Sequence, residues 1–535
     1  MRLVIDLLGY SNRVDPAALR LCAQLAQQCP QETELWVAAS LNDPDALESL
    51  RLEPALAQRV RSVELPSSGA VRAQLRRHAL HSLVGQHAGA VLAVGRPATA
   101  GDQGDAPYPL LVQDPGTAVD AAALVDALVA LARKGVPKTP SARPKLAYVS
   151  PLPPVHSGIA DYSAELVPEL ATFYEVELVV AQDSVTDPRL DGMALRTPDW
   201  LRAHAHEFER VVYHFGNSHA HQHMFELLRD VPGTVVLHDF FLSGVLDNLE
   251  REEYLPKGFL HALYESHGYS GLLSHRREGR NPSIWKYPLN KGVLDHANGV
   301  IVHSDFSRQL ATDWYGADAA DGWRTIPLLR GRPDGCASDA ERARARTEAR
   351  TRLGLAEDEF VVCTFGMLGG TKLNAELLDA FLASPLGADP HCRLVFVGAN
   401  DPGPYGEQLA GKIAASAAAE RIRITGFVDA AAYADWLAAC DGAVQLRSST
   451  RGETSASVLD CLLYGAPTIV NAHGSTAALD GELLIKLDDG FEIAALATAL
   501  TTLRQDGELR ARLTRRALGF MAAHHAPQHV GRLFA

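Results

Sequence analysis

The sequence predicts an α/β protein that is built from doubly wound parallel sheets in three domains. Short apolar runs, each the length of a buried strand, alternate with amphipathic stretches along most of the chain. Glycine, histidine or small hydroxyl residues follow several of these runs, at the strand ends where doubly wound sheets bind ligands. The 535 residues suffice for about three domains. We therefore expect an N-terminal α/β domain at residues 1–136, a linker at 137–144, and two doubly wound domains at 145–330 and 331–535.

Composition argues against several classes of protein. The formal net charge of −14 argues against broad nucleic-acid binding, because that activity needs a basic face. No apolar run approaches the length of a bilayer span, and Asp6 interrupts the apolar start, so we expect neither a membrane helix nor a signal peptide. The seven cysteines are scattered without a CxxC pair, which is typical of reduced thiols in a cytoplasmic protein.

Residues 1–133 alternate between strand-like and helical patterns. The strand candidates are Leu3–Leu7, Glu34–Ala38, Ser62–Leu65, Ala90–Val94 and Leu110–Val112. The helix candidates are Ala17–Gln28, Val71–Val84 and Val119–Arg133. Phosphate-loop glycines and acid–base constellations are missing here, so we expect a structural or docking domain that takes no part in catalysis. The Pro-rich stretch Lys134–Pro144 predicts the linker.

The second unit begins with a clean strand at Lys145–Val149. A loop that contains a Pro-Leu-Pro-Pro run follows, and then a helix that reaches about Thr172. Gly158 stands just before this helix, where the missing side chain would let a substrate approach the backbone N–H groups.

A histidine follows one of the next two strands, Val211–Tyr213 and Thr234–Leu237. His238 and Asp239 come directly after the second strand, at the strand end where doubly wound sheets bind ligands. We favour a functional role for His238. The alternative is a structural histidine that pairs with Asp239.

Three further histidines, His219, His221 and His223, lie between these strands, after Asn217. His219 and His223 would share one face of a helix, which is one requirement of a metal site. No carboxylate or cysteine adjoins them to complete a coordination shell. We therefore expect no metal here and a solvated start of a helix.

Residues 251–298 are rich in Tyr, His, Arg and Gly, with a basic cluster at 275–280. They predict a long irregular insertion, for which a wall of an acceptor site and simple packing are both open interpretations. Val300–Val302 and Thr325–Leu328 are the last strand candidates of this domain, and Arg330–Ser338 is the expected hinge.

The third unit opens with a charged helix at Asp339–Leu353 and a strand at Phe360–Phe365. A glycine-rich loop runs from Gly366 to Lys372, before a helix at Asn374–Ala383. A lysine beside such a strand-end loop suits a phosphate, and a solvated surface lysine is the alternative. Further strands are expected at Arg393–Val397 and Arg423–Thr425, and a late helix at Glu508–Ala523.

A strand–loop–helix–strand pattern covers residues 443–471, and we expect the rest of the protein to be organised around it. Apolar runs at Ala443–Leu446 and Thr468–Val470 predict the strands, and helical spacing covers Ser455–Tyr464. Gly465 would end the helix as a left-handed cap.

The start of that helix is a predicted anion site. Free N–H groups and the positive end of the helix dipole point outward there. Arg447 and Arg451 add fixed positive charge in the preceding loop. A phosphate or diphosphate is therefore the expected ligand.

The same stretch resembles the family-4 glycosyltransferases of the GT-B fold. In one subgroup of this family the stretch contains a loop of sequence GETS, here Gly452–Ser455. A helix that ends in Gly-x-Pro follows it, here Gly465–Pro467. The segment at 145–163 resembles the opening of the family's acceptor domain. The resemblance covers about residues 145–520 and implies two Rossmann-like domains that face one cleft.

Roles for individual residues follow from this resemblance. His238 matches the histidine that faces the donor sugar, Lys372 matches the donor-phosphate lysine, and Glu453 would orient sugar hydroxyls. The donor-binding residues would be Gly366, Lys372, Arg447, Gly426, Phe427, Glu453, Thr454, Ser455 and Asp460, with the nucleobase on the 426–428 loop. The acceptor-side residues would be Ser157, Gly158, Asp161 and Asn217.

Two departures from the family pattern affect these roles. Met367 replaces the usual arginine, and we infer that Arg447 supplies the missing charge. The family signature has seven residues between two glutamates, whereas six separate Glu453 from Asp460. If Asp460 corresponds to the second glutamate of the signature, the position of the first glutamate is occupied by Gly452. The role of Asp460 therefore stays open.

The expected function is transfer of a hexosyl group from a nucleoside-diphosphate sugar to a glycan or lipid-linked glycan, with retention of configuration, in surface polysaccharide assembly. Likeness to polysaccharide mannosyltransferases favours GDP-mannose as the donor. We expect no cofactor and no metal, a cytoplasmic location with peripheral contact to the inner face of the membrane, and an N-terminal domain that docks to a protein or to itself. A non-catalytic binding relative and a nucleotide-sugar epimerase or phosphorylase are the alternatives.

Overall fold

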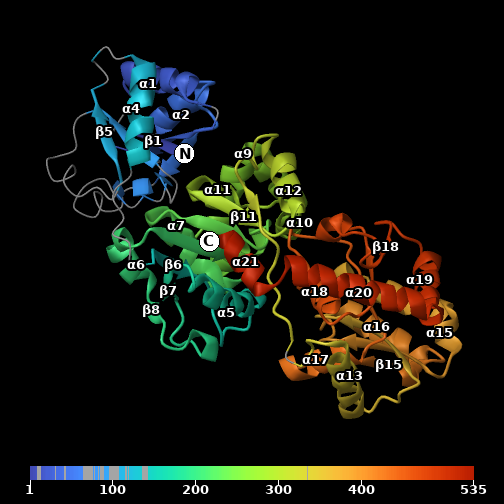
Figure 1. Ribbon diagram of the computed structural model, residues 1–535. Coiled ribbons are helices and arrows are strands. Elements are labelled where there is room, and N and C mark those ends of the chain that lie inside the picture. The colour runs from blue at the N-terminus through green and yellow to red at the C-terminus, as the bar shows by residue number, and fades with distance from the viewer. Residues whose placement is uncertain are drawn as a thin grey trace. The chain divides into compact units, whose positions relative to one another are not determined.

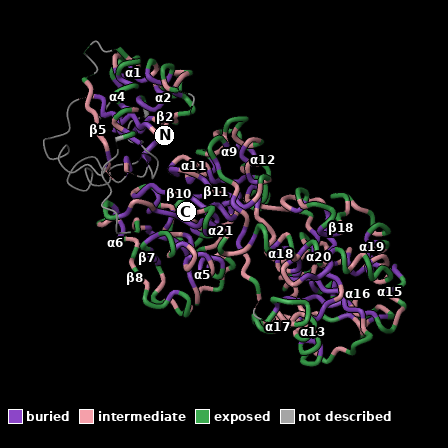
Figure 2. The backbone as a smooth tube through the Cα atoms, in the orientation of Figure 1, coloured by how far each residue is buried: buried purple, intermediate pink, exposed green. Residues whose placement is uncertain are grey.

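A computed structural model of the protein contains three parallel β-sheets, each covered by helices (Figure 1). It describes residues 1–8, 14–30, 32–40, 44–63, 76–77, 79–81, 83–84, 89–95, 108–114, 117, 120–134, 143–333 and 335–535. The predicted α/β fold class is therefore confirmed. The central strands of each sheet are mostly buried (Figure 2), which explains why they are recognisable in the sequence as mainly apolar runs.

The first sheet has the strand order β3-β2-β1-β4-β5. Its strands are β1 (Arg2–Asp6), β2 (Glu34–Ser40), β3 (Val60–Val63), β4 (Gly89–Val94) and β5 (Leu110–Gln113). Its helices include α1 (Pro16–Gln28), α2 (Pro44–Leu52) and α4 (Ala121–Lys134). All five predicted strands are present, whereas most of the predicted Val71–Val84 helix and of the linker lies outside the described residues.

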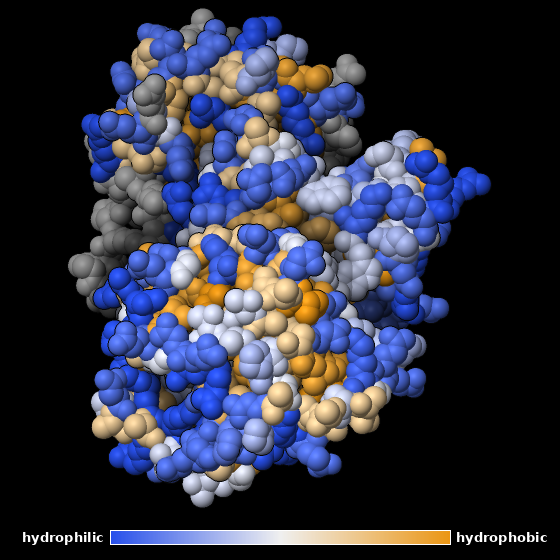
Figure 3. All heavy atoms as spheres, turned by 90° about the vertical axis from the view of Figure 1, so that its right-hand side faces the viewer, coloured by the Kyte–Doolittle hydropathy of each residue, from blue (hydrophilic) through white to orange (hydrophobic). Residues whose placement is uncertain are grey.

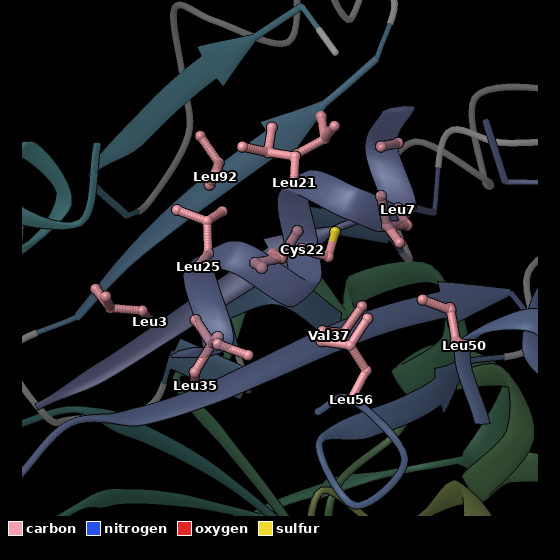
Figure 4. Close-up of a cluster of buried hydrophobic side chains, with 14 of the residues drawn as sticks. Leu3, Leu7, Leu21, Cys22, Leu25, Leu35, Val37, Leu50, Leu56 and Leu92 are labelled. Atoms are coloured by element: carbon pink, nitrogen blue, oxygen red, sulfur yellow. The ribbon is translucent and has the colours of Figure 1, made fainter. Parts of the chain in front are cut away.

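Leucines of α1 and of the first sheet form one core. Figure 4 shows Leu21 and Leu25 of α1 pointing toward the sheet, with Leu3 of β1 and Leu92 of β4 beside them. These side chains are buried, and transferring each from water contributes about 1.5–3 kcal/mol.

The second sheet has the order β12-β11-β10-β9-β6-β7-β8. Its strands are β6 (Lys145–Val149), β7 (Glu175–Val179), β8 (Ala194–Arg196), β9 (Arg210–Phe215), β10 (Thr234–Leu237), β11 (Gly299–Val302) and β12 (Arg324–Thr325). Its helices include α5 (Gly158–Leu170), α6 (Pro198–His204), α7 (Gln222–Asp230) and α12 (Asp305–Tyr315). The prediction of a strand at Thr325–Leu328 is wrong beyond Thr325, since Pro327 has no N–H to donate to a ladder.

The insertion at 251–298 is helical, which corrects the prediction of an irregular segment. It contains the end of α8 (Ser243–Arg251), α9 (Gly258–Glu278) with a kink at Gly268, α10 (Arg280–Lys286) and α11 (Lys291–His296). A core of its own holds these helices together, with Phe259 and Leu263 fully buried. Packing therefore accounts for one side of the insertion, while Tyr264, Tyr269, Leu273 and Trp285 are exposed.

The third sheet has the order β15-β14-β13-β16-β17-β18. Its strands are β13 (Phe360–Phe365), β14 (Cys392–Val397), β15 (Ile422–Ile424), β16 (Gly442–Gln445), β17 (Thr468–Asn471) and β18 (Ile485–Leu487). Its helices are α13 (Asp339–Leu353), α14 (Asn374–Ala383), α15 (Pro385–Ala388), α16 (Pro404–Ala415), α17 (Ala430–Ala439), α18 (Ala456–Leu463), α19 (Ile493–Gln505), α20 (Gly507–His524) and α21 (Pro527–Phe534). Gly465 ends α18 with φ +71°, as predicted.

Contacts divide the chain into two compact units. Unit 1 comprises Met1–Val302 and Ala311–Arg324, and it contains the first two sheets. Unit 2 comprises His303–Leu310 and Thr325–Ala535, and it contains the third sheet.

Hydrophilic side chains cover most of the face shown in Figure 3, with smaller hydrophobic areas between them. Within the described residues, no helix combines the length and the apolar character that crossing a bilayer requires.

Candidate active site

The topology of unit 2 reverses between the neighbouring strands β13 and β16. Strands β14 and β15 follow β13 on one side, whereas β16, β17 and β18 occupy the other side. The connections after β13 and β16 therefore leave in opposite directions, and ligands of doubly wound sheets bind at such a point. The predicted donor loops at 366–372 and 447–455 follow these two strands.

The loop after β13 brings Lys372 back over the strand end. Gly366 has φ +101°, and a Cβ at this position would lie 2.5 Å from Lys372 Nζ. Glycine is therefore needed both for the backbone conformation and for the space that the lysine occupies. A short 3-10 helix at Gly370–Lys372 ends the loop, and Ser448 N donates to Thr371 O at 3.0 Å, which ties the two predicted donor loops together.

The guanidinium of Arg447 lies at the start of α18. Its Nη2 donates to Ser455 Oγ at 3.3 Å, and Nη1 donates to Leu446 O at 2.8 Å. Ser455 occupies the N-cap position, yet its side chain accepts nothing from the first turn of the helix. The N–H groups of that turn are therefore left for another acceptor, as the sequence predicts.

Lys372 and Arg447 form a pair of partly desolvated cations. Burial and, to a smaller extent, the nearby charge of Arg447 lower the pKa of Lys372 to about 8, against a smaller raising effect of Glu453. Burial also lowers the pKa of Arg447. Within the described residues the Lys372 ammonium makes no hydrogen bond or ion pair. Two such charges beside an uncapped helix start would be stabilised by an anion.

The carboxylate of Glu453 stabilises its own loop. Its Oε2 accepts from Arg451 N at 2.6 Å and from Thr450 Oγ1 at 3.0 Å. Ser307 Oγ donates to the neighbouring Gly452 O, and Ser475 Oγ donates to Glu453 O. Thr454, another predicted donor residue, has a buried hydroxyl with no partner among the described residues. Together these contacts hold the GETS loop in one conformation.

Asp460 lies in the middle of α18 and forms an ion pair with Arg330. Arg330 Nε lies 3.0 Å from Asp460 Oδ1, and Tyr433 donates to Oδ2 at 3.1 Å. Burial raises the pKa of Asp460 against the lowering effects of Arg330 and Tyr433. Both lone-pair faces of the carboxylate are thus engaged by protein groups, which favours a structural role over contact with a donor.

The predicted nucleobase loop follows β15. Gly426 has φ +75°, and its carbonyl accepts from Thr425 Oγ1 at 2.8 Å. Phe427 is 83% exposed and Met367, after β13, is 63% exposed. Apolar side chains with this much free surface at strand ends can each contact a planar ring.

In unit 1 the topology reverses in the same way between the neighbouring strands β6 and β9. Ser157 caps α5 by accepting from Ile159 N at 3.2 Å. A Cβ at Gly158 would meet no atom within 4 Å, so the backbone there is open to a ligand. Asp161 is exposed in the first turn of the same helix. The structure thus brings three of the four predicted acceptor residues to one helix start.

His238 has a histidine partner that the sequence did not suggest. It is 9% exposed, and its Nε2 lies 3.0 Å from Nδ1 of His214, a residue of β9. Tyr162 of α5 contacts the edge of the His238 ring at 5.0 Å. Asp239 Oδ2 accepts from Asn217 N, and Asn217 Oδ1 accepts from Val245 N, so the fourth acceptor candidate joins two loops.

The three histidines after β9 correct the expectation of a solvated helix start. His219 is exposed, but His221 is fully buried, and its Nδ1 donates to Ser218 O at 3.1 Å and lies 3.1 Å from Ser218 Oγ. Burial lowers the pKa of His221 and of His223 to about 4, so both rings are neutral near pH 7. Among the described residues, no three His, Cys, Asp or Glu side chains form a group that could hold a metal ion.

Sequence reasoning missed Asn471, the last residue of β17. It is 1% exposed and makes hydrogen bonds to both backbone groups of Arg447. A polar residue at the end of a buried apolar strand is a signal that could have drawn attention to it.

No family model and no curated relative matches the sequence. Solved structures do match it. Anabaena HepE in complex with UDP-glucose is 17% identical with a TM-score of 0.51, over 73% of this chain and 98% of HepE. The sucrose-phosphate synthase of Thermosynechococcus elongatus is 15% identical with a TM-score of 0.51, over 73% and 97%. A glycosyltransferase of Rickettsia africae is 11% identical with a TM-score of 0.52, over 73% and 97%. The chain therefore has the GT-B fold, with two Rossmann-like domains, as predicted.

Proposed function

We propose that this protein is a family-4 glycosyltransferase that moves a hexosyl group from a nucleoside-diphosphate sugar to a glycan acceptor, with retention of configuration. The observation that carries the proposal is the pair of partly desolvated cations, Lys372 and Arg447, at the ends of β13 and β16, with the uncapped start of α18 beside Arg447. The GT-B fold and the UDP-glucose bound by HepE support the same reading. A nucleoside diphosphate has the charge and the size that such a site suits.

The proposed chemistry uses these cations to stabilise the leaving group. As the bond from the sugar to the diphosphate breaks, negative charge grows on the phosphate oxygens, and preorganised cations lower the energy of that state. Glu453 is held by its own loop and Asp460 by Arg330, so neither is disposed as the nucleophile of a double displacement. The leaving phosphate would instead take the acceptor's proton on the same face, with Glu453 orienting sugar hydroxyls. His238 would contribute to catalysis from unit 1.

The donor and acceptor are assigned by class. GDP-mannose is the donor favoured by the sequence resemblance, and UDP-glucose is the ligand of a similar structure. The acceptor would be a glycan or lipid-linked glycan of a surface polysaccharide, received near Ser157, Gly158, Asp161 and Asn217. Exposed Tyr264, Tyr269 and Leu273 on α9, close in sequence to Arg276 and Arg277, would suit peripheral contact with a membrane.

We further propose a cytoplasmic location, because all seven cysteines are free thiols. The N-terminal domain would dock to another protein or to a second copy. Within unit 1 it also contacts the second domain, where Ser62 Oγ donates to Asp295 O at 3.0 Å and Gln58 Nε2 donates to Asp318 at 2.6 Å.

Incubation of the protein with a panel of nucleotide sugars, which includes GDP-mannose and UDP-glucose, and with glycan acceptors tests the proposal. We expect release of free nucleoside diphosphate that depends on the acceptor, together with an extended glycan. Isomerised or phosphorolysed sugar from donor alone would identify an epimerase or phosphorylase. Binding of nucleotide without any turnover would identify a non-catalytic relative.

Metal removal gives a separate prediction. Because lysine, arginine and a helix start supply the positive charge at the proposed phosphate site, we expect transfer to continue at the same rate in EDTA. The measurement is the initial rate before and after chelation. Loss of activity that magnesium or manganese restores would contradict the assignment.

Lys372 predicts a pH dependence of donor binding. Its pKa of about 8 means that the ammonium loses its proton as the pH rises through that value, so affinity for a nucleoside diphosphate should fall above about pH 8. The free energy of unfolding of the nucleotide-free protein should instead increase as the pH rises above about 8. The reason is that Lys372 in the unfolded chain keeps its proton at a pH where the folded protein has released it. Calorimetry at pH 8.5 in two buffers of different ionisation enthalpy should show proton uptake on binding UDP or GDP. Lys372→Arg, which keeps its charge, should show none.

A further inference from the structure

Asn471 extends the pairing of β16 with β17 by means of its side chain. The backbone ladder between these strands ends at Gln445 and Val470. Two residues beyond Gln445, Arg447 N donates to Asn471 Oδ1 at 2.8 Å, and Asn471 Nδ2 donates to Arg447 O at 2.6 Å. The amide therefore binds the Arg447 backbone as a neighbouring strand would.

A carboxylate fixes the orientation of this amide. Asn471 Nδ2 also donates to Asp489 Oδ1 at 3.0 Å, and the same oxygen lies 2.8 Å from His473 Nδ1. The Arg447 N–H needs an acceptor, while the Arg447 carbonyl and Asp489 both need donors. Only one of the two amide orientations satisfies all three groups, and it is the one observed.

We propose that Asn471 is a positioning residue for the donor diphosphate, which acts through Arg447 and is braced by Asp489 and His473. The inference rests on the proposed function, since it assigns a role at the same anion site. The Arg447 side chain extends from a backbone that Asn471 holds on both sides, and its guanidinium contacts Ser455 at the start of α18. A shift of this backbone would move the charge away from the site, and displacements of about 1 Å can cost two orders of magnitude in rate.

Asn471→Asp is the variant that tests the proposal. It keeps the size of the side chain and the acceptor for Arg447 N, but it replaces the donor with an oxygen that faces the Arg447 carbonyl and Asp489. We expect at least a tenfold loss of UDP or GDP affinity by calorimetry on the full chain, about the effect of one misplaced charge. Asp489→Ala removes the acceptor that orients the Asn471 amide but leaves Asn471 itself in place. Asp489 is exposed, and we expect its replacement to cause a smaller loss of nucleotide affinity than Asn471→Asp.

A control variant and a double variant distinguish a positioning role of Asn471 from a general loss of structure. Thr468→Val changes a fully buried residue of the same strand, whose hydroxyl bonds to Ala466 O, and should leave nucleotide affinity unchanged. In an Arg447→Ala background, Asn471→Asp should have no further effect on affinity, because the group that it positions is gone. The proposal is overturned if Asn471→Asp binds nucleotide as wild type does, or if its loss persists in that background. Wild-type protein that binds neither nucleotide would instead refute the proposed function.

Discussion

Lys372→Ala and Arg447→Ala are each expected to lower kcat/KM for sugar transfer by about two to three orders of magnitude, the usual effect of losing one preorganised charge from a transition-state site. Both residues follow strand ends at the topological reversal of unit 2, and neither forms an ion pair with a carboxylate of the described residues, although Glu453 is near enough to raise both pKa values. Their charge would be used where the leaving diphosphate develops its own. The losses should be larger in kcat than in donor affinity if the contacts strengthen as the bond breaks.

Folding of these variants should be unaffected or slightly improved. Removing one of two cations that repel each other relieves an unfavourable interaction in the free protein, as the lowered pKa of Lys372 shows. Lys412→Ala, at an exposed lysine of the same unit that pairs with Asp379, serves as the matched control and should retain wild-type rates. A well-folded double variant of Lys372 and Arg447 with wild-type turnover would refute the assignment of the site.

The sheets could be predicted from the sequence because their strands are buried on both faces. Lys145–Val149, Thr234–Leu237 and Phe360–Phe365 are mostly apolar runs of strand length, and the structure places β6, β10 and β13 at the same residues. The glycine loop before Lys372 and the Gly465 cap could also be predicted, since their backbone conformations favour glycine.

Long-range partners could not be predicted. Asp460 meets Arg330 from a segment 130 positions earlier, and nothing local to α18 indicates that pairing. The contacts of Asn471 with Arg447 and Asp489 depend on the neighbouring positions of β16 and β17 in the sheet. Helices α9 and α10 escaped prediction because several of their apolar and aromatic side chains are exposed among polar ones, so the apolar periodicity that marks a helix is weak there.

Loss of the ion pair between Arg330 and Asp460 should be the most destabilising single change near the site. The two side chains are 13% and 21% exposed, and Arg330 N also donates to His525 O at 2.9 Å, at the end of α20. The segment that enters unit 2 is thereby fastened to the middle of α18 and to the end of α20. Removing one partner of a buried pair costs about 3–5 kcal/mol, and partial exposure places these changes toward the lower value.

The two halves of the pair should differ in their response. Asp460→Ala leaves the Arg330 guanidinium without its ion-pair partner, and this group cannot lose its proton. Arg330→Met leaves the Asp460 carboxylate without its partner, but this group can gain a proton. Burial already raises the pKa of Asp460, and without Arg330 it should rise further. A folded-state pKa above the unfolded value destabilises the protein as the pH rises through it, so Arg330→Met should regain stability as the pH falls below neutrality, while Asp460→Ala should not.

Urea unfolding of the full chain between pH 5 and pH 8, followed by circular dichroism, measures this difference. Arg352→Met is the control, since Arg352 pairs with Asp435 at a position where more than half of the arginine is exposed, and it should cost less than about 1 kcal/mol at either pH. Equal destabilisation by Arg330→Met and Asp460→Ala at every pH would show that burial does not raise the pKa of the Asp460 carboxyl. If both variants unfold like the control, the ion pair does not stabilise the fold. The structural role of Asp460 would then be refuted, and contact with the donor would be the remaining interpretation.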